Sequence, residues 1–129
     1  MSEELDGTLR LIDLFPMLYD LAINDSVYFV DEIERSMHAN IVQNLINIFA
    51  GYNNNSQLII TTHEVQLMSQ LMFRKDEIWF TEKNIQGATT LKSLEEFRIR
   101  YDKEIRKDYL QGLFGGTPAP YDKSWINKI

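Results

Sequence analysis

Two short apolar segments of the sequence run directly into side chains that could do chemistry. VYFVDE ends in Asp31 and Glu32, and LIITTH ends in Thr62 and His63. Ligands of open α/β sheets bind outside the carboxyl ends of the strands, so two parallel neighbouring strands would bring these side chains to one edge. One carboxylate there could hold a hydrated magnesium ion while the other orients a water for attack on a nucleotide. A histidine, whose ordinary pKa lies near neutral pH, could hydrogen-bond the terminal phosphate.

Both segments also have interpretations that involve no nucleotide. A hydrophobic strand followed by Asp31 and Glu32 can simply mark the chain leaving the core, and His63 alone is as typical of a helix cap. A metal-dependent hydrolase that uses Asp31, Glu32 and His63 directly is a further alternative. Adjacent acids on a strand point to opposite faces, however, and so share one ion poorly. Both strands end in polar side chains, the acids on the first and the histidine on the second, and this order favours the nucleotide site over the alternatives.

The elements that would position these residues alternate between helix and strand. Apolar spacing and turn signals predict a helix over 8–23, a strand over 27–30, a helix over 36–50, a strand over 58–62, a helix over 65–73, paired strands over 76–83 and 88–93, and a helix over 94–110. Pro16 predicts a kink or a restarted turn in the first helix. The two unbroken apolar strands predict a parallel sheet covered on both faces. The alternation predicts a layered α/β fold, with an irregular tail over 112–129.

Composition narrows the class of protein. At 129 residues the chain has the size of one domain, and its net charge of -6 disfavours a surface that tracks nucleic-acid phosphates. The absence of cysteine excludes disulfides, thiolate metal sites and a cysteine nucleophile. No uninterrupted apolar run is long enough to cross a bilayer, and the acidic start MSEELDGT is unlike a secretion signal. We therefore expect a cytoplasmic protein with no membrane partner.

Four segments, in this order, resemble the motifs of ABC-type ATPases. ELDGTLRLIDL is similar to the signature segment of the SMC- and RecF-like branch, and VYFVDE resembles a Walker B strand with its catalytic glutamate. RSMHANI is similar to a D-loop, and LIITTH resembles the strand and switch histidine. With DEIWFTEK, GATTLKSLEEF and YLQGLFGGTP included, the resemblance covers almost the whole chain. The chain is similar to a bacterial group of ABC-type ATP-binding proteins of the AAA family, linked to phage-defence and abortive-infection systems.

This resemblance implies a P-loop NTPase-like fold, represented here by its C-terminal subdomain with a mostly parallel sheet and flanking helices. It implies a single partial domain over 1–129, with the signature segment at 4–10, Walker B at 27–32, the D-loop at 35–39 and the switch histidine at 63. By the same resemblance Asp31 would hold magnesium, largely through water. Glu32 would polarise the attacking water, and His63 would contact the γ-phosphate of ATP.

The remaining motif residues would serve a second subunit. Ser36 and His38, at the start of the next helix, would lie in the loop that contacts the opposing subunit of a homodimer. The nucleotide held by that subunit would be contacted by a further set of residues, namely Asp6, Gly7 and Thr8. The helix that follows them would aim its N-terminus at phosphate. Leu5 stands where the signature usually has a serine, so the phosphate-binding hydroxyl would have to come from Thr8 or be missing.

A P-loop is not found in the sequence. It requires G-x-x-x-x-G-K-S/T, and none of the six glycines begins or completes that motif. We therefore expect the C-terminal half of an ATPase, whose partners would be ATP with magnesium, the missing N-terminal Walker A half and a second copy. The chain alone is expected to be inactive. The alternative is a non-catalytic interaction or oligomerisation module that retains the ATPase fold.

Nucleic acid is a further partner to consider. A basic cluster lies near the end of the chain, at Arg98, Arg100, Lys103, Arg106 and Lys107. Five acidic residues between 95 and 108 interleave with it, which is typical of a solvated helix face with i,i+4 pairs. This pattern favours a solvated helix over a nucleic-acid interface.

Overall fold

The computed structural model describes residues 2–52, 54–68, 72–98 and 105–116. The chain divides into two compact units, Met1–Leu67 and Met68–Ile129. The nucleotide-site residues expected from the sequence all belong to the first unit. Among the described helices, none combines the length and the apolar character needed to cross a membrane.

The first unit alternates helix and strand, as the sequence predicts. Its elements are α1 (Ser2–Ile23), β1 (Val27–Val30), α2 (Ala39–Ala50), β2 (Gln57–Ile60) and the 3-10 turn η1 (Val65–Leu67). The strands β1 and β2 pair in parallel, with Val27 opposite Gln57 and Val30 opposite Ile60. A parallel pair needs a crossover connection, and α2 provides it. The predicted parallel neighbours are therefore confirmed.

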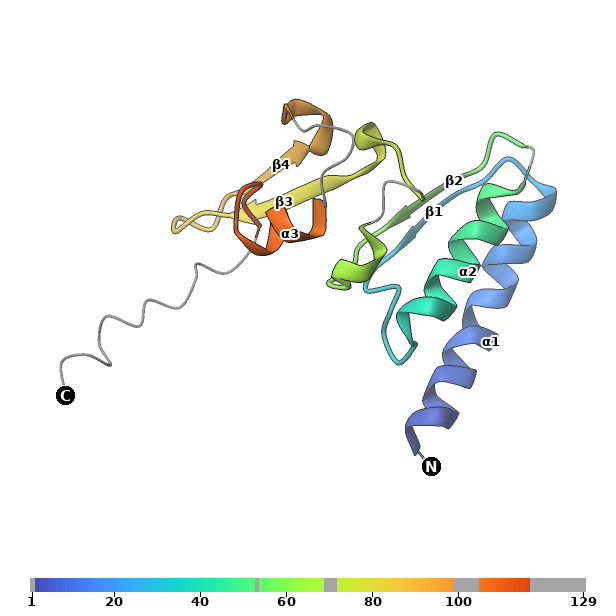
Figure 1. Cartoon of the computed structure of the whole chain (residues 1–129). Helices are drawn as coiled ribbons and strands as arrows, with labels where there is room; N and C mark the ends of the chain where they lie inside the picture. The colour runs from blue at the N-terminus through green and yellow to red at the C-terminus, as the bar shows by residue number, and fades with distance from the viewer. Residues whose placement is uncertain (1, 53, 69–71, 99–104, 117–129) are drawn as a thin grey trace. The chain divides into compact units, whose positions relative to one another are not determined.

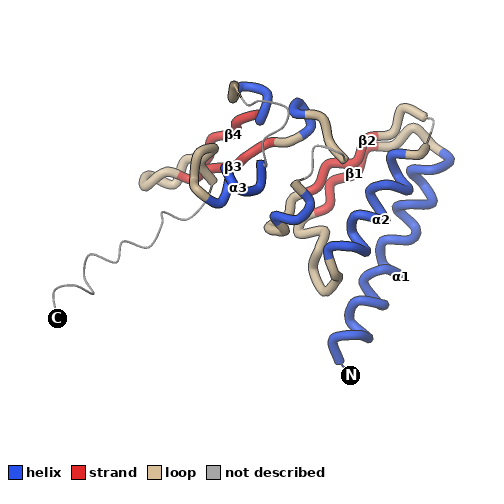
Figure 2. The backbone as a smooth tube through the Cα atoms, viewed as in Figure 1, coloured by secondary structure: helices blue, strands red, loops and turns tan. Residues whose placement is uncertain are grey.

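Both helices of the first unit lie on one side of its strand pair (Figure 1; Figure 2). The buried apolar residues between these layers are Leu14, Met17, Leu21, Val30, Ile33, Val42, Ile46 and Leu67. On β1, by contrast, Val27 is 57% exposed and Phe29 is 76% exposed. The prediction of cover on both faces is therefore wrong for the first unit, because its two helices pack on the same face.

Both helices of the first unit begin at residues other than those predicted. Helix α1 begins at Ser2 rather than near residue 8, and it runs through Pro16 without a break. Proline removes one helix hydrogen bond, but tertiary packing of Leu14 and Leu21 keeps the surrounding turns helical. Helix α2 begins at Ala39 rather than at residue 36, because Ser36 has φ 61, which lies outside the right-handed helical region.

The second unit is built on the predicted hairpin, in which β3 (Trp79–Lys83) and β4 (Thr89–Ser93) pair antiparallel. The turn between the strands is closed by the Asn84 side chain, which accepts hydrogen bonds from the N–H groups of Gln86 and Ala88. Of the sheets described, one is thus parallel and the other antiparallel. The expectation of a mostly parallel sheet holds only for the first unit.

Beyond β2, the described residues contain only parts of the predicted helices. Only the turn η1 forms within 65–73, and residues 69–71 of that predicted helix lie outside the described residues. The predicted helix over 94–110 is described as a 3-10 turn, η3 (Leu94–Glu96), and a short helix, α3 (Ile105–Leu110), while 99–104 lie outside. Arg100 and Lys103 of the basic cluster fall in that gap, as do 117–129 of the predicted irregular tail.

The core of the second unit is aromatic. Phe80 stacks on Tyr109 and Phe114 with ring centroids 5.5 Å and 5.1 Å apart, and Phe97 meets Phe114 edge-on at 5.0 Å. Phe80 is 5% exposed. Another 3-10 turn, η2 (Lys75–Glu77), precedes β3.

Candidate functional site

The two parallel strands of the first unit deliver two irregular segments to the same edge. Residues 31–37, here called the Asp-Glu turn, follow β1, and residues 61–64, here called the switch segment, follow β2. The N–H of Thr61 donates to the carbonyl of Val30 at 3.0 Å, and the N–H of Ile33 donates to the carbonyl of Thr61 at 3.1 Å. These bonds extend the ladder past the strands and hold the two segments side by side.

Thr61 joins the carboxylate of Asp31 to the backbone of Glu32 in the predicted nucleotide site. Its hydroxyl accepts the N–H of Glu32 at 2.9 Å and donates to Oδ1 of Asp31. One oxygen of Asp31 is thereby oriented by the protein, while the residue as a whole stays exposed. The sequence interpretation missed Thr61, although its position directly after the strand, one residue before the expected Thr62, was the available signal.

Glu32 and His63 face one another across the two segments. Nε2 of His63 lies 3.8 Å from Oε1 of Glu32, with the side chains 88% and 52% exposed. Glu32 has φ 47, in the left-handed region that ordinary residues rarely adopt. Such a conformation is a common mark of functional turns. A polar contact this exposed contributes little to stability, so its interest lies in placing a carboxylate and an imidazole together in solvent.

A third acid, Glu34, binds the switch segment and was not predicted. Its Oε1 accepts the backbone N–H of His63 at 2.7 Å. Partial burial tends to raise the pKa of Glu34, but hydrogen bonds from the His63 backbone and the Thr62 side chain outweigh it and hold the pKa below its ordinary value. Glu34 is therefore an ionised acceptor. In the sequence nothing distinguishes Glu34 from a solvent-exposed acid after the strand.

The segment predicted as a signature lies within helix α1, not ahead of it. Asp6, Gly7 and Thr8 follow the first turn of α1, so the expectation that a later helix aims its N-terminus at phosphate is wrong. The position of Gly7 has a packing reason. A Cβ added there would lie 2.6 Å from the carbonyl oxygen of Ser36. Helix α1 therefore packs directly on the Asp-Glu turn, and only glycine permits that approach.

A polar cleft of about 390 Å³ lies where α1 meets the Asp-Glu turn. It is lined by Asp6, Leu9, Arg10, Asp13, Arg35 and Ser36. Within the described ranges neither Arg10 nor Arg35 forms an ion pair, and the buried Nε of Arg10 has no hydrogen-bond partner. The structure thus brings Asp6 and Ser36 to one surface. His38 is exposed at the N-cap of α2 and makes no side-chain capping bond.

The edge fits a magnesium ion only in combination with other ligands. Nowhere in the described part of the chain do three or more His, Cys, Asp or Glu side chains gather as a metal site. Magnesium in nucleotide sites keeps several waters and takes one or two carboxylates together with substrate phosphates. The exposed carboxylate of Asp31 suits that mode, in which the protein supplies a single acid.

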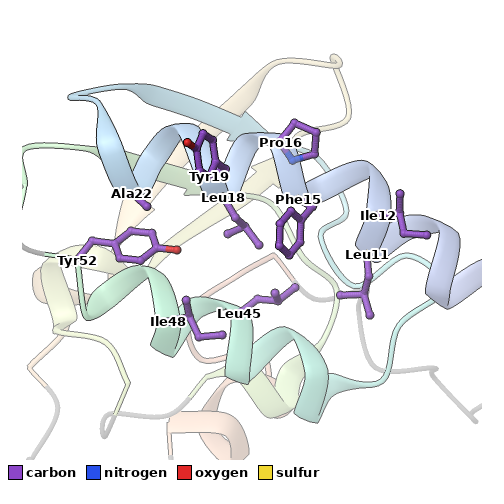
Figure 3. Close-up of a pocket in the computed structure, with 10 residues that line it drawn as sticks. All are labelled: Leu11, Ile12, Phe15, Pro16, Leu18, Tyr19, Ala22, Leu45, Ile48 and Tyr52. Carbon is purple, nitrogen blue, oxygen red and sulfur yellow. The ribbon is translucent and has the colours of Figure 1, made fainter.

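Another hollow of the first unit has a different character. It is an apolar groove of about 940 Å³ between α1 and α2, and none of the residues discussed above lines it. Figure 3 shows Leu11 and Phe15 of α1 pointing towards Leu45 and Ile48 of α2 across this groove. Its lining contains no carboxylate or imidazole, unlike the carboxyl edge of the strands.

Comparison with known protein families identifies the first unit. Residues 3–69 match the family described as "AAA domain, putative AbiEii toxin, Type IV TA system", which is just over half of the chain. The chain belongs to this AAA-domain family. The match runs from α1 to just beyond η1, and so includes the polar cleft, the Asp-Glu turn and the switch segment. No curated protein and no solved structure matches the chain.

Membership in the AAA-domain family makes the first unit part of an ATPase-type, nucleotide-binding domain. AAA domains have the P-loop NTPase fold and bind ATP with magnesium. The parallel strand pair with its crossover helix is consistent with that fold. The predicted AAA-family relationship is thus confirmed at the level of the family.

Proposed function

We propose that this chain supplies the Walker B, switch, D-loop and signature portions of an ABC-type ATPase. The observation that carries the proposal is the approach of Glu32 to His63, 3.8 Å apart at the carboxyl edge of two parallel strands. Thr61 fixes the neighbouring acid, Asp31, at the same edge. A carboxylate for the magnesium ion and a second group that orients the attacking water are among the protein groups that nucleotide hydrolysis uses.

Each residue at the edge has a distinct role in this proposal. Asp31 holds the hydrated magnesium ion, which supplies charge neutralisation on the phosphates when it is bound. Glu32 accepts a hydrogen bond from the attacking water and orients it, because its exposed carboxylate extends from a turn with fixed backbone hydrogen bonds. His63 donates a hydrogen bond to the terminal phosphate, and its position beside Glu32 puts the two groups on either side of the water.

The polar cleft serves a nucleotide held by a second copy. Asp6 and Ser36 come from the two motifs that would face that copy, and both line the cleft beside the packing of Gly7 on Ser36. Gly7 thereby acts through packing. Two copies related head to tail would each present this cleft to the other. Leu5 replaces the usual signature serine, so Thr8 supplies the hydroxyl.

The sequence has no G-x-x-x-x-G-K-S/T motif, which is the P-loop that binds the nucleotide phosphates. The P-loop is therefore supplied by another segment. We propose that this chain acts together with a polypeptide that supplies it. The description of the family names a toxin and a type IV toxin–antitoxin system. We therefore propose that ATP turnover serves an abortive-infection or phage-defence process.

The test is ATP turnover by the wild-type chain and by Glu32→Gln, each combined with a P-loop polypeptide from the same family. Glu32→Gln should lose about a hundredfold or more in turnover, as expected for removal of a general base, while ATP binding is retained. Glu64→Gln is the matched control, because the Glu64 side chain accepts only a local bond from the N–H of Gln66. Wild-type turnover in Glu32→Gln would remove Glu32 from its role.

A second candidate function is a non-catalytic association module, favoured by the apolar surface of the first unit. Phe29 on β1 and Phe15 on α1 are 76% and 70% exposed. Large exposed apolar residues of this kind mark interaction surfaces. In this case the chain should self-associate in sedimentation experiments, and Phe15→Glu or Phe29→Glu should weaken the association. A chain that stays monomeric at high concentration would exclude the module.

A further inference from the structure

We propose that Glu34 is a positioning residue that couples the Asp-Glu turn to His63. Its carboxylate ties the backbone of His63 to the turn, so that a displacement of the turn near Ser36 moves the histidine. This inference rests on the proposed function, in which His63 contacts the terminal phosphate and Ser36 faces a second copy. In this inference Glu34 transmits a displacement between the contact of Ser36 with the second copy and the contact of His63 with the phosphate.

The bond between Glu34 and His63 joins residues 29 positions apart. At 2.7 Å from Oε1 to the backbone nitrogen, it is at the short end of N–H···O distances, as charge-assisted bonds are. The other carboxylate oxygen, Oε2, is buried and has no hydrogen-bond partner in the described part of the chain. The carboxylate thus holds the backbone of the switch segment at His63, whereas the imidazole of His63 is left 88% exposed and can meet a ligand.

Glu34 is itself fixed within the Asp-Glu turn. Its carbonyl accepts the N–H of Met37 at 2.8 Å, and the N–H of the preceding Ile33 donates to the carbonyl of Thr61 at 3.1 Å. Ile33 is only 1% exposed and anchors this part of the turn in the core. A carboxylate on so constrained a backbone can transmit a displacement, since it has little freedom to absorb one.

The far end of the turn rests on helix α1. The carbonyl of Ser36 packs against Gly7, and Ser36 itself has φ 61, so its backbone occupies a conformation with few neighbouring alternatives. Contacts therefore run without a gap from Gly7 through Ser36 and the turn to Glu34, and from Glu34 to His63. Both ends of this path border the proposed ligand surfaces.

The first experiment measures hydrogen exchange at the His63 amide in the purified chain. Glu34→Ala should speed this exchange about tenfold or more, the scale expected for loss of a bond to a charged acceptor. Glu34→Gln keeps an oxygen acceptor at the same place and should restore most of the protection. Glu64→Ala, whose carboxylate bonds only two residues away, should leave the exchange unchanged. Wild-type exchange in Glu34→Ala would overturn the inference.

The second experiment tests the coupling by perturbing the other end of the turn. Ser36→Val disfavours the left-handed backbone at 36, and Gly7→Ala pushes on the same carbonyl. Either change should shift the amide resonance of His63, and the shift should disappear in the Glu34→Ala background. Both variants are used so that a failure of one to fold leaves the test intact. A shift that persists without Glu34 would show that the turn acts on His63 by another route.

ATP turnover with the P-loop polypeptide then separates the inference from the proposed function. Glu34→Ala should lower turnover about ten- to a hundredfold through misplacement of His63, with ATP binding retained and partial rescue in Glu34→Gln. Turnover that is unchanged in Glu34→Ala would overturn the positioning role. Wild-type turnover in Glu32→Gln would instead overturn the proposed function, while the hydrogen-exchange result at His63 would still decide whether Glu34 holds the segment.

Discussion

Replacement of Gly7 by alanine tests the packing of α1 on the Asp-Glu turn. The added Cβ would lie 2.6 Å from the carbonyl oxygen of Ser36, which is closer than such atoms approach in folded proteins. The oxygen belongs to the backbone of a residue with φ 61, so it cannot rotate away as a side chain would. Relief requires a shift of either the helix or the turn.

The structure predicts that this substitution destabilises the chain, against the intrinsic preference for alanine. Within a helix, alanine is favoured over glycine by about 1 kcal/mol. Overpacking of a tight contact costs about 1–3 kcal/mol. The difference is a net loss of about 1 kcal/mol in the free energy of unfolding, obtained by setting the middle of the overpacking range against the helix preference.

The assay is urea unfolding followed by the helical circular dichroism signal, to which α1 and α2 are the main contributors. Asn44 is exposed in α2 and lines neither of the hollows described above, so Asn44→Ala and Asn44→Gly measure the preference for alanine away from the contact of α1 with the turn. Alanine should be better than glycine at position 44 and worse at position 7. A Gly7→Ala variant that gains as much stability as the Asn44 pair indicates would refute the close packing of α1 on Ser36.

Three further predictions concern the site, the second unit and the response to pH. Thr61→Val should lower turnover by at least tenfold with ATP binding retained, because the hydroxyl that accepts the N–H of Glu32 is lost. Thr61→Ser keeps a hydroxyl and should restore turnover. Equal turnover in the two variants would contradict the role of the hydroxyl. Phe80→Ala should lower the free energy of unfolding by about 3–5 kcal/mol, measured by heat or urea, because the ring stacks in the buried core. Phe80→Leu should lower it much less. A loss in Phe80→Ala no larger than that from truncating an exposed side chain would contradict the stacking. Hydrogen bonds from the Asn55 side chain and backbone N–H hold the pKa of Asp25 below its ordinary value, so its contribution to stability is present above the unfolded-state pKa and is lost as the pH falls through the folded-state pKa. The free energy of unfolding of the wild type should therefore exceed that of Asp25→Ala by less in acid than at neutral pH. A difference that grows in acid would contradict the lowered pKa of Asp25 in the folded protein.

The sequence was sufficient to predict the parallel strand pair. Short runs of β-branched and aromatic residues bounded by turn signals have few alternative structures, and the helix between them makes the parallel connection natural. The approach of Glu32 to His63 followed from that pairing, because both residues lie in the short segments that follow their strands. The hairpin of the second unit was predicted in the same way from its turn residues.

Tertiary contacts account for what the sequence did not reveal. Nothing local indicates that Glu34 accepts the N–H of a residue 29 positions away, since an acid in a charged stretch reads as solvent-exposed. The position of Gly7 inside α1 was missed because glycine ordinarily weakens a helix, whereas here the approach of Ser36 requires it. The late start of α2 likewise depends on the left-handed backbone of Ser36, for which serine carries no signal.

ATP hydrolysis by the chain alone and in combination with the P-loop polypeptide tests the central claim most directly. The account predicts no turnover by the chain alone, turnover by the wild-type combination, and its loss when Glu32→Gln replaces the wild type. Turnover by the chain alone that disappears in Glu32→Gln would mean that the chain grips phosphate by other residues. Equal turnover by the wild-type and Glu32→Gln combinations would contradict the role of this edge in catalysis.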